Sequence, residues 1–115
     1  MSTFIETSLH RLKMIKEWRI WVERIARVAK ELIPSVEVYV VGSVVKGDYV
    51  GGSNVDVLIV SRSIPEKPFE RARIKVLIEE RLNLPYYQPF ELHLLRPREA
   101  ELYLNKARGR MVKII

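Results

Sequence analysis

Two segments in the first half of the chain carry residue types that suit phosphate and metal chemistry. Residues 41–47 read Val-Gly-Ser-Val-Val-Lys-Gly, and residues 53–60 begin with Ser-Asn-Val-Asp and continue as an apolar run. A turn of small residues lets backbone N–H groups approach phosphate oxygens closely. Side chains two residues apart on a strand point to the same face, so Asn54 and Asp56 can reach one cation. Together the two segments predict nucleotide chemistry.

The elements around these segments can be read from residue patterns. Residues 36–41 are rich in β-branched side chains and predict a strand, which Gly42 interrupts. Ser43 can then cap a short helical turn that runs to about Lys46. Residues 47–53 contain three glycines and predict a loop, and residues 55–61 are apolar almost throughout, as in a strand covered on both faces.

Helical periodicity marks three further regions. Residues 7–33 predict one long amphipathic helix that ends before Pro34. Its apolar stripe includes Trp18 and Trp21, which belong either to the core or in part to a surface that faces a partner. Residues 69–82 predict a second helix, and residues 98–106 predict a last one that Pro97 opens.

A third strand is predicted over residues 90–95, where apolar and polar residues alternate and Glu91 shares a face with His93. Residues 111–115 form an apolar tail that fits a helix end, an edge strand or an interface. The order of elements predicts an α/β (α+β) fold in which helices flank a small mixed sheet. The length of 115 residues predicts one domain over residues 1–115.

Composition narrows the class of protein. The chain has no cysteine, which excludes disulfides, thiolate metal sites and cysteine nucleophiles. No apolar run reaches the roughly 18 residues of a membrane span, and residues 1–30 are charged throughout, so we expect a soluble cytoplasmic protein. The net charge of +6 favours acidic partners, or reflects a solvated basic helix face. Few Asn and Gln residues suggest a thermophilic source.

The spacing of Gly42-Ser43, nine residues, then Ser53-Asn54-Val55-Asp56 resembles the motif of the polymerase-beta type nucleotidyltransferase superfamily. The whole chain looks like a member of its minimal nucleotidyltransferase branch, with the polymerase-beta-like fold. Residues 89–93, Pro-Phe-Glu-Leu-His, resemble a segment common in archaeal members.

The resemblance implies roles for five positions. Gly42 and Ser43 would hold the phosphates of a nucleoside triphosphate. The two positions of the family's aspartate pair, here Asn54 and Asp56, would bind Mg²⁺. Glu91 would take the place of the family's third carboxylate, which also binds the metal and activates the attacking hydroxyl. For this to work, Asp56 and Glu91 must lie on adjacent strands.

Two more residues, Lys46 and Ser53, belong to the expected nucleotide-binding set, and some of the expected site residues also fit other roles. Lys46 and Ser53 flank the phosphate turn, although Lys46 also fits a solvated lysine. Glu91 could instead pair with a nearby Arg or Lys, and His93 fits a structural hydrogen-bonding role better than a catalytic one.

Asn54 is the departure from the family pattern. An amide oxygen can ligate a hard cation but neutralises none of its charge, and Asn54 also fits a turn residue that caps the loop. Magnesium needs only about one or two carboxylates when phosphates complete its shell, so binding stays possible while two-metal catalysis is less secure.

Two hypotheses about function follow. The first is Mg²⁺-dependent transfer of a nucleoside monophosphate to a hydroxyl acceptor. The family resemblance implies that such a domain acts as the antitoxin half of a pair with a HEPN-type helical protein. The second is a nucleotide- or partner-binding module that Asn54 has weakened as a catalyst. A basic protein that binds RNA is a weaker reading without a supporting motif, and an oligomer is left open.

Overall fold

Helices pack on both faces of a single sheet in the computed structural model, which describes residues 3–48 and 54–115. The elements of these ranges are, in chain order, α1 (Phe4–Lys16), α2 (Trp18–Leu32), β1 (Glu37–Val41), the 3₁₀ turn η1 (Ser43–Lys46), β2 (Val55–Val60), α3 (Pro68–Arg81), β3 (Phe90–Leu95), α4 (Pro97–Ala107) and β4 (Met111–Lys113). Within the described ranges, no helix has the length and apolar character needed to cross a bilayer.

The sheet has the strand order β3-β2-β1-β4 and is mixed, as predicted. β1 runs antiparallel to both β2 and β4, whereas β2 and β3 are parallel. Parallel neighbours need a crossover connection, and α3 supplies it. Residues 111–113 of the apolar tail form an edge strand and not a helix end.

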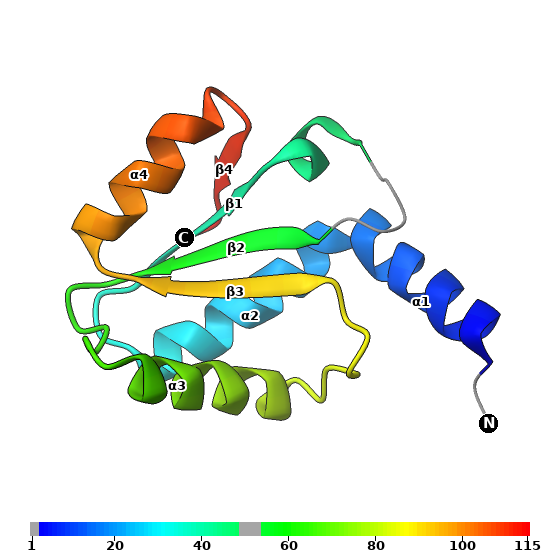
Figure 1. Ribbon diagram of the computed structural model, residues 1–115, viewed down its shortest axis with the longest axis horizontal. Coiled ribbons are helices and arrows are strands. Elements are labelled where there is room, and N and C mark those ends of the chain that lie inside the picture. The colour runs from blue at the N-terminus through cyan, green and yellow to red at the C-terminus, as the bar shows by residue number, and fades with distance from the viewer. Residues whose placement is uncertain (1–2, 49–53) are drawn as a thin grey trace.

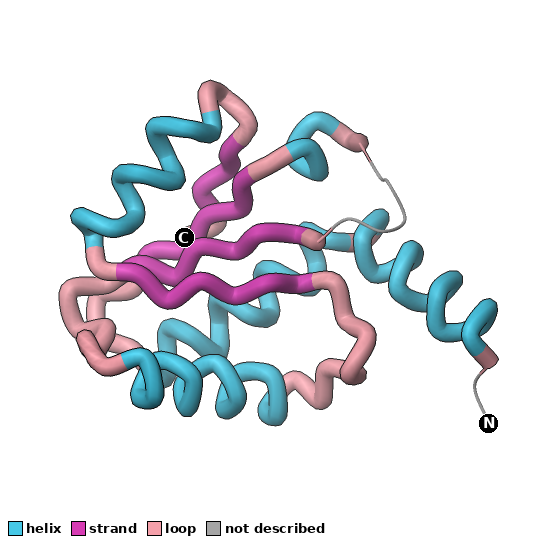
Figure 2. Tube along the Cα trace, in the orientation of Figure 1, coloured by secondary structure: helices cyan, strands magenta, loops and turns pink. Residues whose placement is uncertain are grey.

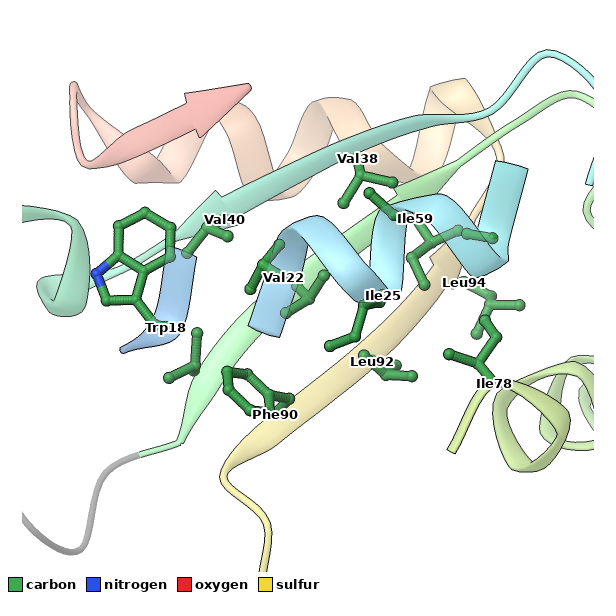
Figure 3. Close-up of a cluster of buried hydrophobic side chains, with 14 of the residues drawn as sticks. Trp18, Val22, Ile25, Val38, Val40, Ile59, Ile78, Phe90, Leu92 and Leu94 are labelled. Carbon is green, nitrogen blue, oxygen red and sulfur yellow. The ribbon is translucent and has the colours of Figure 1, made fainter. Parts of the chain in front are cut away.

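The two faces of the sheet carry different helices: α2 and α3 lie on one face and α4 on the other (Figures 1 and 2). The larger core lies under α2 and α3 (Figure 3), where residues such as Ile25 and Ile78 meet strand residues such as Ile59. The smaller core lies under α4 and includes Leu58 and Ala100. β2 is covered on both faces, which explains its nearly continuous apolar sequence.

The prediction of one helix over residues 7–33 is wrong, because the helix breaks at Glu17. Glu17 has φ −98° and ψ 25°, and it serves as the end of α1 and the beginning of α2. α2 packs along the sheet, whereas α1 extends beyond it and buries only Met14 and Ile15 at its base (Figure 1). The periodicity runs through the break, and neither glycine nor proline marks it.

The two tryptophans of α2 belong to the core. Trp18 is 5% exposed, and Trp21 packs on the cluster with its ring centroid 6.3 Å from that of Phe90. Ile20, between them, stays half exposed. The stripe is therefore wide because α2 is buried against both the sheet and α3, not because the tryptophans face a partner.

Candidate active site

The polar residues of β2 and β3 lie on the α4 face of the sheet. Side chains alternate along a strand, so Asp56 shares its face with Leu58 and Val60. α4 covers Leu58 and Val60 but not the beginning of the strand. The side chain of Asp56, which lies beyond the area that α4 covers, is therefore 41% exposed.

Glu91 lies directly opposite Asp56, because β2 and β3 pair in parallel with these two residues in register. The prediction that the two carboxylates occupy adjacent strands is confirmed. His93 lies two residues further along β3, on the same face, and its ring contacts Tyr103 of α4 at a centroid distance of 5.2 Å. The face thus collects two carboxylates and one imidazole.

These three side chains converge on one point. The Nε2 atom of His93 is 3.0 Å from Oδ1 of Asp56 and 4.0 Å from Oε1 of Glu91. One potential ligand atom from each residue lies within 4.8 Å of the other two. Because an ionised carboxylate only accepts hydrogen bonds, His93 donates its Nε2–H to Asp56.

Asn54 lies just before β2 and is held by two other side chains. Its Oδ1 accepts a hydrogen bond of 2.8 Å from Nη2 of Arg11, and its Nδ2 donates one of 3.1 Å to Oε2 of Glu91. Arginine only donates and an ionised carboxylate only accepts, so the orientation of the amide is fixed by its partners. The Asn54 oxygen, which we expected to ligate the metal, is directed to Arg11.

Gly42 adopts a backbone conformation that favours glycine, with φ 105° and ψ −171°. Its N–H donates to the carbonyl of Arg110 just before β4, over 2.9 Å. A Cβ atom at this position would lie 3.9 Å from Oδ2 of Asp56. The glycine turn therefore lies beside the carboxylates, but its first N–H is already used by the sheet edge.

The other residues expected to contact phosphates are Ser43, Lys46 and Ser53, and they differ in their surroundings. Ser43 begins the 3₁₀ turn, and within the described part of the chain its hydroxyl makes no hydrogen bond. It therefore does not cap the turn as predicted, since the cap position falls on Gly42. Lys46 is exposed at the end of the turn. Ser53 lies outside the described residues.

Comparison with known proteins identifies the family. A family model described as a nucleotidyltransferase domain matches residues 22–113, which is most of the chain. The chain belongs to the nucleotidyltransferase domain family. The resemblance drawn from the sequence is thereby confirmed. A search of curated proteins gives no match.

A solved structure supports the nucleotidyltransferase fold. It is the crystal structure of a protein from Sulfolobus solfataricus described as a candidate nucleotidyltransferase. The match has a TM-score of 0.55 and 24% sequence identity, and it covers 95% of this chain and 83% of that chain. At this identity the likeness shows the fold alone, and the predicted α/β architecture is confirmed.

Nucleotidyltransferase domains generally use a divalent metal, and the converging side chains fit one. Opposite oxygen ligands of one Mg²⁺ are about 4.2 Å apart, so the spacing of up to 4.8 Å needs only a small side-chain adjustment. Two carboxylates suit Mg²⁺, whereas the imidazole nitrogen of His93 is a better ligand for Mn²⁺ or Zn²⁺. The residues present therefore fit a divalent cation held chiefly by Asp56 and Glu91.

Sequence reasoning missed one contributor and undervalued another. Arg11 lies on α1, 43 residues before Asn54, and nothing in its local sequence distinguishes it from the other basic residues. His93 was expected to make a structural hydrogen bond, and it does, but its partner is Asp56 itself. The signal for His93 was present, because it shares the strand face of Glu91.

Proposed function

We propose that this protein transfers a nucleoside monophosphate from a nucleoside triphosphate to a hydroxyl acceptor, with a divalent metal bound by Asp56 and Glu91. The observation that supports this most is the register of β2 and β3, which sets the two carboxylates side by side, next to the turn at Gly42. In the transfer, the acceptor oxygen bonds to the α-phosphorus and pyrophosphate leaves. Magnesium is the proposed metal because its usual ligands are carboxylates and phosphate oxygens.

Beyond binding the metal, the proposed residues contact phosphates, accept a proton or orient another side chain. The Ser43 hydroxyl and N–H hold the terminal phosphates, with Lys46 and Ser53 as further phosphate contacts. Glu91 accepts the proton of the attacking hydroxyl at a carboxylate oxygen. His93 keeps Asp56 oriented through the hydrogen bond of 3.0 Å. A bound metal ion would stabilise the negative charge that develops on the phosphates.

The acceptor and partner are proposed from the family resemblance. We place the acceptor hydroxyl on another macromolecule. A HEPN-type helical protein is the proposed partner, with this chain acting as its antitoxin.

One observation favours a second candidate function. The position of the first family aspartate is Asn54, whose oxygen accepts a hydrogen bond from Arg11. With one negative charge fewer, the site would hold a cation less tightly. The alternative is therefore a module that binds a nucleotide or a partner without turnover.

The two candidates differ in one assay. The native chain is incubated with α-labelled nucleoside triphosphates, Mg²⁺ or Mn²⁺, and candidate partner proteins or RNA, and label in the macromolecule is measured. We expect slow transfer that Asp56→Asn abolishes and that Glu101→Gln, an exposed carboxylate of α4, leaves unchanged. Nucleotide binding by calorimetry without any labelled product would support the binding module.

A further inference from the structure

Asn54 connects a helix outside the sheet to the carboxylate opposite Asp56. The guanidinium of Arg11 on α1 donates to the amide oxygen, and the amide nitrogen donates to Glu91. Glu91 itself is at the beginning of β3, with its carboxylate 46% exposed. An exposed glutamate has several rotamers, so a hydrogen bond to one oxygen restricts where the other can point.

The amide suits this place better than the carboxylate of the family pattern. The side chain at position 54 must accept a hydrogen bond on one side and donate one on the other. Asparagine does both, whereas an ionised aspartate would accept from Arg11 but repel Glu91. The substitution that looks like a lost metal ligand is thus matched to its two neighbours.

α1 is fixed beside the site by more than this one contact. Met14 and Ile15 at its base are buried in the main core. Nδ1 of His10 lies 2.6 Å from the hydroxyl oxygen of Tyr87, and the two rings meet edge to face. Tyr87 belongs to the connection that leads into β3. Arg11 therefore projects from a helix that is anchored on both sides of it.

We propose that Arg11 and Asn54 are positioning residues: the chain Arg11–Asn54–Glu91 holds the Glu91 carboxylate in place for the divalent cation, and Asn54 is not itself a metal ligand. This inference rests on the proposed function for the identity of the ligand, a divalent cation at Asp56 and Glu91. It adds α1, which lies before the region matched by the family model, to the working parts of the site.

The first test measures binding of Mn²⁺ alone by calorimetry and electron paramagnetic resonance, without nucleotide. Supporting residues of metal sites typically change affinity about 10-fold to 100-fold. We expect Arg11→Met and Asn54→Ala each to weaken binding about 10-fold, and the double variant to be no weaker than either single one. Lys13→Met, an exposed change on the same helix, should have no effect.

Asn54→Asp separates positioning from direct ligation. If Asn54 acts through Glu91, the new carboxylate repels Glu91 and Mn²⁺ affinity stays level or falls. If position 54 is a ligand position, Asn54→Asp raises the affinity about tenfold or more, even with Arg11→Met, and that result overturns the proposal.

A second test needs no metal, so the proposal can fail or survive independently of the proposed function. Thermal unfolding is measured for Arg11→Met, Glu91→Ala and the pair, first with Asn54 and then in an Asn54→Ala background. We expect the two changes to be coupled with Asn54 present and to add independently without it. Independent effects in both backgrounds would overturn the proposal. Undetectable Mn²⁺ binding by the native chain, with the coupling intact, would instead count against the proposed function.

Discussion

The two ends of the β2–β3 strand pair carry charged clusters of opposite character. At the end where both strands finish, here called the far end, Arg71 of α3 donates to the carbonyls of Pro65 and Leu94. It also forms an ion pair of 2.9 Å with Glu99. At the near end, where both strands begin, Asp56 and Glu91 lie side by side. The ion-pair partner of both is His93, which is charged only when it is protonated.

The far cluster has the form of a structural network. Arg96 repeats the pattern of Arg71, since it donates to the carbonyl of Ile64 and pairs with Glu66. The hydrogen bond from Arg71, followed by one from the Arg96 backbone, lowers the pKa of Glu99 below its usual value. Arg71 and Arg96 are thus each paired with a glutamate, as expected of a network that stabilises the fold.

In the described part of the chain, the ion-pair partner of the near carboxylates is His93, whereas the far glutamates pair with arginines. Two carboxylates in register repel each other, so this end carries a cost in stability that a bound cation would remove. We interpret the contrast as a division of roles on the same two strands: the far charges stabilise the fold, and the near charges form the proposed ligand site. The following predictions test that division.

The largest effect is expected from Asp56→Asn. Loss of one of the two carboxylates should lower divalent metal affinity at least about 100-fold while the unfolding temperature stays level or rises, because like-charge repulsion is relieved. Calorimetric titration with Mn²⁺ and thermal unfolding measure the two quantities. A clear fall in unfolding temperature would mean that Asp56 is structural.

Arg71→Met should do the reverse. It removes the side-chain donor of two carbonyls and the ion-pair partner of Glu99, which should cost about 3 kcal/mol of unfolding free energy, with metal affinity unchanged. Urea unfolding measures the loss. Arg73→Met, at an exposed position two residues along the same helix, should change the free energy by less than about 0.5 kcal/mol. Equal effects of the two variants would refute the structural role of the Arg71 network.

Gly42→Ala tests the point where fold and site meet. Its φ of 105° is unfavourable for any side chain, so the variant should lose about 1 to 2 kcal/mol of stability. Nucleotide affinity should fall as well, because the turn carries the proposed phosphate contacts. Gly109→Ala, another glycine with positive φ and open space around it, is the matched control, which should lose stability but retain nucleotide affinity.

The smallest expected effect is the pH dependence of folding stability that comes from Glu99 in the far cluster. The folded pKa of Glu99 is lowered, so its ion pair contributes stability above the unfolded pKa of about 4.5 and loses that contribution as pH falls through the folded value. The difference in unfolding temperature between the native chain and Glu99→Gln should therefore shrink from about pH 6 to about pH 3. A constant difference would show that the ionised carboxylate contributes little.

Local pattern was sufficient for three strands and for Asp56. β-branched and alternating residues marked β1, β2 and β3, the motif spacing identified Asp56, and the family resemblance implied Glu91 on the adjacent strand. These features depend on residues close together in sequence, or on the pairing of neighbouring strands that a family pattern specifies.

Two features escaped the sequence because they depend on tertiary contacts. The break at Glu17 has no proline or glycine to mark it, and it follows from where the buried stripe of α2 begins. The contact of Arg11 with Asn54 depends on the angle that this break sets between α1 and α2. The chain has 20 Lys and Arg residues, and only the fold shows that Arg11 is one that reaches the site.

The hydrogen bond from Gly42 to Arg110 also bears on how the protein is made. β1 is synthesised early, but its β4 neighbour comes from the other end of the sequence. Domains emerging from the ribosome fold as units once their parts are available. The turn at Gly42 therefore gains this hydrogen bond only after residues 110–113 have emerged, so a nascent chain that stalls before this point carries the nucleotidyltransferase motif without its completed turn.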